Sequence, residues 1–343
     1  MKCAPVLIVT LNRYSHLRRC IESLQRNKLA KDTDLYIGLD YPPSQEYEAG
    51  YEQVLNYLNG GIDGFHEVVI VKQSVNKGID GNFKVIQNAA YEKYDRYIYS
   101  EDDNEFSPNF LEYMNRSLEK YNDDDTILAV AGYNYPMGTT LFKGNVFKCE
   151  TYFAAYGYGI WKQKEEEMRK HLNMSVFLKL YKDNGYMKEL ARKSKNQYVN
   201  MVKGMLKYTP DLIYGDQLRQ VDLSYGLYMA ASGMKMVYPV ISKVRNWGYD
   251  GTGVNCGEVR YKQSNAENHR NFNFEKQVID LEPEFGVILE DTEITPGQID
   301  RLLDEYFCIS GKEYTKTKAA YLLSRIVGLD RAQRMMSPAK KCQ

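Results

Sequence analysis

The sequence contains no long apolar run and no paired cysteine motif. No stretch approaches the roughly 18 consecutive apolar residues of a membrane-spanning helix, so we expect no transmembrane segment. The N-terminus lacks the basic and then apolar layout of a signal peptide. The cysteines form no CxxC pair, which argues against a zinc site or a dense disulfide framework and favours reduced thiols in a cytoplasmic protein.

An excess of charge of one sign is also missing. Lys+Arg and Asp+Glu both number 45 in 343 residues, so we expect no nucleic-acid partner. The balance is uneven along the chain, because residues 311–343 carry eight Lys or Arg against only Glu313 and Asp330. Their AAYLLSRIVGLDRAQRMM segment is apolar on one face. It either contacts the inner face of the plasma membrane peripherally or packs on the domain with its charges solvated.

Four short apolar runs predict buried strands of a parallel sheet. They alternate with amphipathic segments, the first with Ser15 as a plausible N-cap, at intervals typical of an α/β fold with a mostly parallel central sheet. A loop at 76–82 opens another helix, and Ser107-Pro108 is expected to cap the helix that follows it. The predicted strands cover residues 4–10, 35–39, 68–71 and 97–99.

The second half is less regular but still patterned. Strands are expected at 146–153 and 236–241, and helices at 162–208 and 216–232, the last closed by Gly233. Two further helical patterns follow a polar stretch. We therefore expect one catalytic domain, residues 1–256, with a nucleotide-binding half (1–105) and an acceptor half (106–256), followed by a helical C-terminal extension, residues 257–343.

The most specific chemical signal is Glu101-Asp102-Asp103, directly after a predicted strand. Ligands of open α/β sheets bind at the carboxyl ends of the strands. Mn²⁺ and Mg²⁺ prefer carboxylate oxygens together with phosphate oxygens and water, so adjacent acids here suit a cation bound to a diphosphate. An acidic pair at a strand end is also common as a solvated turn.

Other polar residues follow the remaining strands at the same edge. The first strand ends in Thr10-Leu11-Asn12-Arg13, without the glycine-rich signature of a dehydrogenase or P-loop enzyme. Arg13 and Lys77 are cations suited to phosphates, and Asp40 is an acceptor suited to a base or ribose. Each is also explained as a solvated loop charge.

These motifs together resemble a known family. PVLIVTLNR, the LD at 39–40, SEDDNEFSPNFLEY, GYGIW and YGDQL occur in the order found in inverting glycosyltransferases of the GT-A fold. The pattern is most similar to the N-acetylglucosaminyltransferase I family and related bacterial polysaccharide sugar transferases of the family 2 type. It implies a nucleotide-sugar donor, with a UDP-sugar preferred, a Mn²⁺ or Mg²⁺ cofactor, and a glycan or lipid-linked acceptor.

The resemblance also implies roles for single residues. Thr10, Asn12 and Arg13 would contact the donor, with Arg13 on its diphosphate. Asp40 would bind uracil under Asn76 and Lys77. Glu101 would approach the sugar, Asp102 the ribose and Asp103 the metal ion. Asp216 would be the catalytic base. The glycine-rich segment 244–256 is interpreted either as a lid from which Arg245 or Trp247 would touch the donor, or as a plain structural turn.

Two departures from the family pattern leave alternatives open. Tyr214-Gly215 stands where the family has tryptophan and a second acid, so Asp216 is equally a helix-capping residue, with Asp211 and Asp222 as other candidates. Asn255 stands where relatives often carry a metal-binding histidine. A retaining transferase, a nucleotidyltransferase and a non-catalytic nucleotide- or sugar-binding protein remain the alternatives.

Overall fold

A computed structural model gives the fold of the chain. It describes residues 3–139, 142–206, 213–214, 217–218, 221–248, 250–253, 279–286, 288–307 and 309–336. The chain divides into two compact units. The first comprises Met1–Lys148, Ala154–Glu165 and Met236–Glu293, and the second comprises Cys149–Phe153, Glu166–Lys235 and Ile294–Gln343. The domain boundary expected at residue 256 falls outside the described residues.

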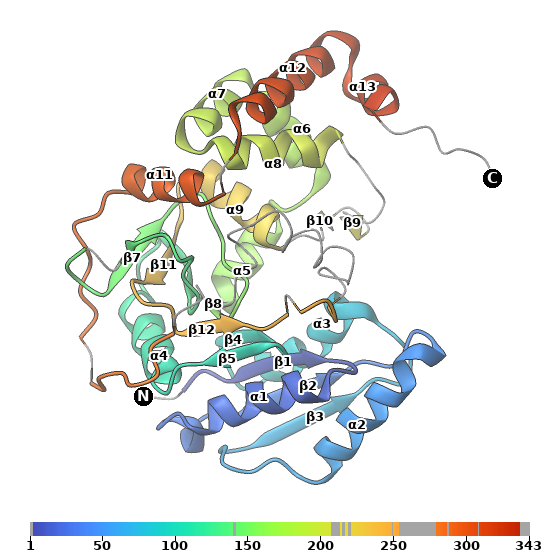
Figure 1. Ribbon diagram of the computed structural model, residues 1–343, viewed down its shortest axis with the longest axis vertical. Coiled ribbons are helices and arrows are strands. Elements are labelled where there is room, and N and C mark those ends of the chain that lie inside the picture. The colour runs from blue at the N-terminus through green and yellow to red at the C-terminus, as the bar shows by residue number, and fades with distance from the viewer. Residues whose placement is uncertain are drawn as a thin grey trace. The chain divides into compact units, whose positions relative to one another are not determined.

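An eight-stranded sheet forms the core of the first unit, with the strand order β3-β2-β1-β4-β8-β6-β11-β7 (Figure 1). β3, β2, β1 and β4 are mutually parallel, and β8 is antiparallel to both β4 and β6, so at least five strands share one direction. The α/β fold with a mostly parallel central sheet is therefore confirmed. The strands are β1 (Val6–Thr10), β2 (Leu35–Leu39), β3 (Val68–Lys72), β4 (Arg96–Glu101), β6 (Ile127–Ala131), β7 (Val146–Cys149), β8 (Tyr158–Trp161) and β11 (Lys235–Pro239).

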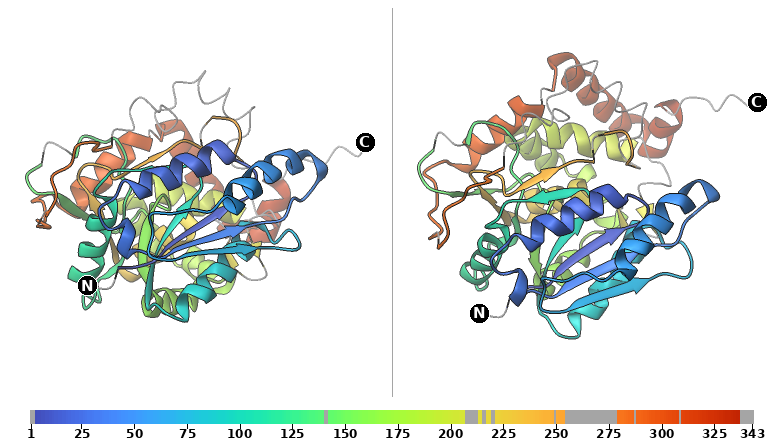
Figure 2. Two further views of the ribbon diagram at one scale, coloured as in Figure 1. Left: turned by 90° about the horizontal axis from the view of Figure 1, so that it is seen from below. Right: turned by 60° about the horizontal axis from the view of Figure 1, so that its bottom comes forward.

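The direction of the crossovers changes at β1. α1 (Tyr14–Gln25) and α2 (Glu48–Asn59) lead outward to β2 and β3, whereas α3 (Gly78–Tyr91) leads back across to β4. α1 and α2 cover one face of the sheet and α3 the other (Figure 2). This reversal makes the gap between the carboxyl ends of β1 and β4 a topological switch point, where open α/β sheets bind ligands.

Close packing fixes the helices on the sheet. All five residues of β1 and of β2 are buried. α3 packs against β2 where Gly38 leaves room for Asn82, whose amide donates to the Gly38 carbonyl at 2.7 Å. A Cβ at Gly38 would lie 2.7 Å from the Asn82 Oδ1, so a larger residue there would displace the helix. α4 (Phe110–Lys120) packs on β6 and β8.

Two predicted helix caps are wrong. α1 begins at Tyr14, so Ser15 lies inside its first turn, and Arg13 precedes it without a side-chain cap. α4 begins at Phe110 after Asn109, and Ser107 instead donates its hydroxyl to the Asp280 carbonyl at 2.5 Å. The predicted strand at 146–153 is shorter than expected and ends at Cys149.

The second unit is mainly helical. α7 (Asn184–Lys193), α12 (Gly311–Val327) and α13 (Leu329–Met336) all pack on α8 (Lys195–Leu206). The remaining elements are α6 (Met174–Lys182), α9 (Val221–Ser232), α11 (Pro296–Phe307), the end of α5 (Lys162–Arg169), and a hairpin of β9 (Ile213–Tyr214) and β10 (Gln217–Leu218). Gly233 follows α9 with a φ of 76°, which confirms its predicted role as the residue that closes this helix. No helix among the described residues is long and apolar enough to cross a membrane.

A buried carboxylate lies in the core of the second unit. Asp300 on α11 is 5% exposed and accepts a hydrogen bond of 2.7 Å from the Thr151 hydroxyl. Burial raises the pKa of Asp300 to about 6, with Glu150 and Asp304 also raising it and Lys193 opposing them. In the unfolded chain the pKa of an aspartate is about 3.9. The folded state therefore holds the proton more tightly than the unfolded state.

We predict that Asp300→Asn stabilises the protein at pH 7. Stability from a raised carboxyl pKa is present below about pH 4 and is lost as the pH rises to about 6, at a cost on the order of 3 kcal/mol. Asparagine keeps an oxygen for the Thr151 hydroxyl and removes the charge. Urea denaturation should give a higher free energy of unfolding than wild type at pH 7 and no gain at pH 4. The exposed Asp330→Asn is the control, and an equal gain at both pH values contradicts the prediction.

Candidate functional site

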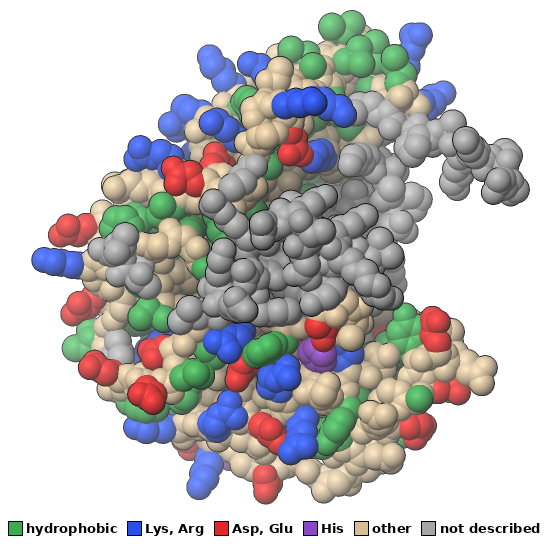
Figure 3. Space-filling view, viewed as in Figure 1, with side chains coloured by type: hydrophobic (Ala, Val, Ile, Leu, Met, Phe, Trp, Pro, Cys, Tyr) green, Lys and Arg blue, Asp and Glu red, His purple; other side chains and the backbone are tan. Residues whose placement is uncertain are grey.

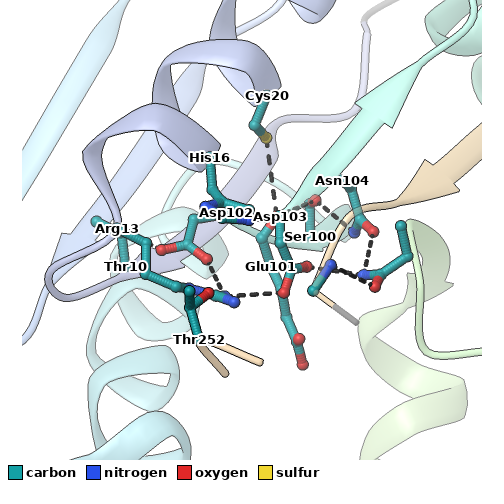
Figure 4. Close-up of polar contacts among 12 residues, drawn as sticks. Thr10, Arg13, His16, Cys20, Ser100, Glu101, Asp102, Asp103, Asn104 and Thr252 are labelled. Atoms are coloured by element: carbon teal, nitrogen blue, oxygen red, sulfur yellow. Dashed lines mark hydrogen bonds and ion pairs between the residues drawn. The ribbon is translucent and has the colours of Figure 1, made fainter. Parts of the chain in front are cut away.

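The carboxyl ends of β1 and β4 bring four predicted site residues together at the switch point (Figure 4). The Thr10 hydroxyl donates to Asp102 Oδ2 at 2.7 Å. The Arg13 guanidinium reaches between the two acids, donating from Nη2 to Asp102 Oδ1 and lying 2.8 Å from Asp103 Oδ2. Thr10, Arg13, Asp102 and Asp103 thus form one polar cluster.

The cluster is buried and carries an excess of negative charge. Asp102 is 3% exposed and Asp103 is 5% exposed, while Arg13 is the cation paired with both. Burial raises the pKa of Asp102 above its ordinary value, although Arg13 partly offsets this. Burial alone would lower the pKa of Arg13, but Asp102 and Asp103 beside it raise that pKa. Arg13 therefore stays charged.

A segment distant in sequence holds Asp103 in place. β12 (Val244–Asn246) pairs antiparallel with β5 (Asn104–Phe106). This pairing brings the buried Asn246 amide to Asp103 Oδ1 at 2.7 Å, and the Trp247 backbone amide donates to the Asp103 carbonyl at 2.8 Å. The Gly248 amide in turn donates to Asn246 Oδ1 at 2.9 Å. Asn246 was not predicted from the sequence as a site residue.

A contact between a histidine and an aspartate borders the same cluster. His16 Nε2, on the first turn of α1, lies 3.0 Å from Asp250 Oδ2. Burial would raise the pKa of Asp250, but hydrogen bonds from the Thr252 amide and hydroxyl, with His16 and Arg13 nearby, hold it below its ordinary value. Sequence reasoning gave His16 no role. Its position three residues after Arg13, in the first turn of the predicted helix, was the available signal.

The residues predicted for the nucleotide base also meet, at the ends of β2 and β3. Asp40 Oδ1 accepts from the Tyr41 and Lys77 backbone amides, both at 2.9 Å. Asp40 Oδ2 lies 3.3 Å from the Asn76 amide, which also donates to the Tyr41 carbonyl at 2.6 Å. Asp40 is 5% exposed, so its carboxylate organises the loop before α3.

Arg245 and Trp247 lie against another partner. The Trp247 indole donates to Glu105 Oε2 at 2.9 Å, and Arg245 Nη1 lies 3.8 Å from the same oxygen. The guanidinium of Arg19 lies 4.5 Å from the centre of the Trp247 ring. Side chains alternate along β12, so Asn246 faces Asp103 while Arg245 is paired with Glu105. Contact of Arg245 or Trp247 with a donor stays a prediction.

Glu101 also lies near the cluster, because its charge helps to raise the pKa of Arg13. The other predicted residues are placed as follows. Asn12 lies in the turn after β1, where its carbonyl is so close to Gly50 that a Cβ there would approach it to 2.4 Å. The carbonyl of Glu101, the last residue of β4, accepts from the Ser100 hydroxyl at 2.7 Å. Asp216, Asp211 and Asn255 lie outside the described residues. Asp222 is on the first turn of α9, with an exposed side chain.

The donor set of the cluster fits a hard divalent cation. No group of three or more His, Cys, Asp or Glu gathers into a metal site within the described part of the chain. Mg²⁺ and related ions, however, commonly use one or two carboxylates with phosphate oxygens and water. Asp102 and Asp103 supply such oxygens, buried and side by side. Cys20 is no competing ligand, because burial and the two carboxylates raise the pKa of its thiol well above the ordinary value.

The family comparison gives one match. The model of glycosyl transferase family 2 matches residues 6–188, a range that contains β1 to β4 and both carboxylates. No curated protein matches the chain.

Three solved structures that are similar to this chain have TM-scores of 0.37 or lower. S. aureus TarS is 15% identical with a TM-score of 0.28, covering 38% of this chain and 21% of that chain. The mannosyltransferase PcManGT from Pyrobaculum calidifontis, solved with GDP-Man and Mn²⁺, is 10% identical with a TM-score of 0.37, covering 94% of this chain and 86% of that chain. The galactosyltransferase LgtC, solved with donor and acceptor sugar analogues, is 14% identical with a TM-score of 0.30, covering 68% and 72%. The match thus spans about a fifth of the TarS chain.

We predict that Gly248→Ala disrupts the cluster. An added Cβ would lie 2.2 Å from Asp103 Oδ2, so residues 246–248 must move away and lose the backbone hydrogen bond to Asp103. Such overpacking costs about 1–3 kcal/mol, which denaturant unfolding should detect as a lower free energy of unfolding. Gly297→Ala is the matched control, because its Cβ would meet no atom within 4 Å. Equal stability of the two variants would show that Gly248 tolerates a side chain.

Proposed function

The chain belongs to glycosyl transferase family 2, and we propose that it is a metal-dependent, inverting glycosyltransferase that uses a nucleotide-sugar donor. The observation that carries the proposal is the pair of buried carboxylates, Asp102 and Asp103, placed at the β1/β4 switch point and bridged by one guanidinium. A polar pair so placed suits the diphosphate end of a donor. The narrower resemblance to the N-acetylglucosaminyltransferase I family stays a prediction.

We propose that the base and the diphosphate of the donor bind at different strands along the carboxyl edge of the sheet. The base would lie at Asp40, where Asn76 and Lys77 converge on the carboxylate. An imide N–H such as that of uracil donates a hydrogen bond, which Asp40 Oδ2 would accept in place of the amide 3.3 Å away. A ring N–H of guanine could donate to the same oxygen, so the choice of a UDP-sugar rests on the family resemblance. Thr10 is the last residue of β1, which lies beside β2, and Asn12 lies in the turn after β1. Both would face the middle of the nucleotide.

The diphosphate would lie at the acidic cluster. Asp103, with Asp102 beside it, would hold Mn²⁺ or Mg²⁺, which when bound neutralises charge developing on the leaving diphosphate. Arg13 is paired with both carboxylates and is long enough to contact phosphate oxygens as well. Asn246 fixes the Asp103 carboxylate from the other side. Glu101, at the end of the same strand, would approach the donor sugar.

Inversion requires a base on the acceptor side. In a single displacement the acceptor oxygen bonds to the anomeric carbon while the bond from that carbon to the diphosphate oxygen breaks. A carboxylate takes the proton of the acceptor hydroxyl. We propose Asp216 for this role, with a glycan or lipid-linked glycan of a surface polysaccharide as the acceptor.

We predict that Asp103→Asn lowers metal-dependent release of nucleoside diphosphate on the order of a hundredfold, because one anionic ligand of the cation is lost. A panel of UDP- and GDP-sugars is assayed with Mn²⁺, with Mg²⁺ and with EDTA. Asp95→Asn is the matched control, since Asp95 precedes the opposite end of the same strand with a side chain 76% exposed. Silence across the panel, with no metal-dependent UDP or GDP binding by calorimetry, leaves a non-catalytic binding protein as the function.

We predict that the product has the anomeric configuration opposite to that of the donor. NMR of the product formed from the active donor gives the configuration directly. Asp216→Asn should abolish transfer while leaving donor binding in calorimetry unchanged, because only the proton acceptor is removed. Asp222→Asn is made in parallel. Loss of transfer in Asp222→Asn alone moves the base to that residue, and retention of configuration refutes the inverting mechanism.

A further inference from the structure

α12 buries one aromatic and two hydroxyl side chains, while several of its aliphatic side chains are exposed. Its buried residues are Thr317, Tyr321 and Ser324, spaced along one face. The Tyr321 ring packs edge-on against the rings of Tyr181 and Tyr198, and its hydroxyl donates to the Tyr181 carbonyl at 3.3 Å. The Ser324 hydroxyl lies 2.7 Å from the Tyr181 hydroxyl. A helix normally buries its apolar stripe and exposes its polar face.

The exposed face of α12 is apolar instead. Leu322 is 53% exposed, Leu323 is 37% exposed and Ile326 is 81% exposed. At 100° per residue these three side chains fall on the side of the helix opposite Tyr321, with the exposed Ala319 between them. Met335 on α13 is 62% exposed. Large side chains gathered on one exposed face indicate an interaction surface, because water disfavours a contiguous apolar patch.

Cations surround this apolar face. Figure 3 shows hydrophobic side chains and Lys or Arg side chains together over α12 and α13. Residues 311–336 contain six basic residues, all exposed, and only two acids. One of these acids, Glu313, is already ion-paired with Lys203 on α8. The basic residues are Lys312, Lys316, Lys318, Arg325, Arg331 and Arg334.

We propose that the exposed face of α12 and α13 binds the surface of an anionic lipid bilayer. The apolar side chains would enter the boundary between headgroups and acyl chains, and the surrounding cations would meet the phosphates of acidic lipids. A second copy of this chain fits less well, because a symmetric contact would set the same cations against each other. The proposal goes beyond the proposed catalytic activity and does not depend on it.

Vesicle flotation of the full chain tests the proposal. We expect binding to vesicles of phosphatidylcholine with 30% phosphatidylglycerol, on the order of the anionic content of natural membranes, and little binding to phosphatidylcholine alone. Binding should weaken as salt is raised from 0.1 M to about 1 M, because screening shortens the electrostatic reach. Ile326→Gln should weaken binding about tenfold. Replacing Arg325 and Arg331 by Gln should weaken it about fivefold for each cation lost.

Two matched control variants test whether vesicle binding depends on this face or on any exposed apolar or basic residue. Ile288→Gln removes an isoleucine that is 75% exposed in the first unit, and Arg192→Gln removes an exposed arginine on α7. Both should bind vesicles as wild type does, and circular dichroism checks that all variants are folded. Equal vesicle binding by Ile326→Gln and wild type overturns the proposal. Self-association in sedimentation that Ile326→Gln abolishes also overturns it, in favour of a second copy.

Discussion

The organisation of the site depends on one guanidinium held between two buried carboxylates. Neighbouring acids at 3% and 5% exposure repel each other and are poorly solvated, so a protein keeps both only with a cation beside them. Arg13 is that cation. It supplies one positive charge for two carboxyl groups, which leaves the cluster incompletely neutralised. A divalent ion that binds with a diphosphate would supply the missing positive charge, and the phosphates would offer Arg13 new anionic partners. The pairing of Arg13 with the two carboxylates would therefore stabilise the empty site and also prepare it for the donor.

This pairing requires the sheet topology as well as the residue types. Arg13 can reach Asp102 and Asp103 only because β1 and β4 are neighbours, although 89 residues separate Arg13 from Asp102. The third support comes from still further along the chain, since Asn246 is 143 residues from Asp103. Antiparallel pairing of β12 with β5 delivers it. The cluster is thus assembled from three segments, and the loss of any one removes a hydrogen bond or charge from a carboxylate that is buried from solvent.

These separations along the sequence explain which features could be predicted from the sequence and which could not. β2 matches its predicted limits of Leu35–Leu39 because a continuous apolar run bounded by polar residues is a local signal. The grouping of Thr10, Arg13, Asp102 and Asp103 followed from the rule that parallel strands end at one edge. Asn246, Asp250 and their pairing with Asp103 and His16 could not be found this way, because no local pattern encodes antiparallel contact between segments so far apart. The alternation along β12, which separates Asn246 from Arg245, likewise needed the register.

Two further features depart from the usual burial of apolar groups and exposure of charged groups. One is a buried carboxylate, and the other is a set of exposed aliphatic side chains. Asp300 is buried with a single hydroxyl donor shown for its carboxylate, and protonation near pH 6 relieves that cost within the unit itself. Protonation cannot relieve the unfavourable exposure of the apolar face of α12 in the same way. Leu322, Leu323 and Ile326 stay exposed however the surrounding groups titrate, and their cationic neighbours keep a basic surface of this kind from associating with itself. Exposed aliphatic side chains with cations around them suit a medium that is apolar within and anionic at its surface, which describes an acidic bilayer.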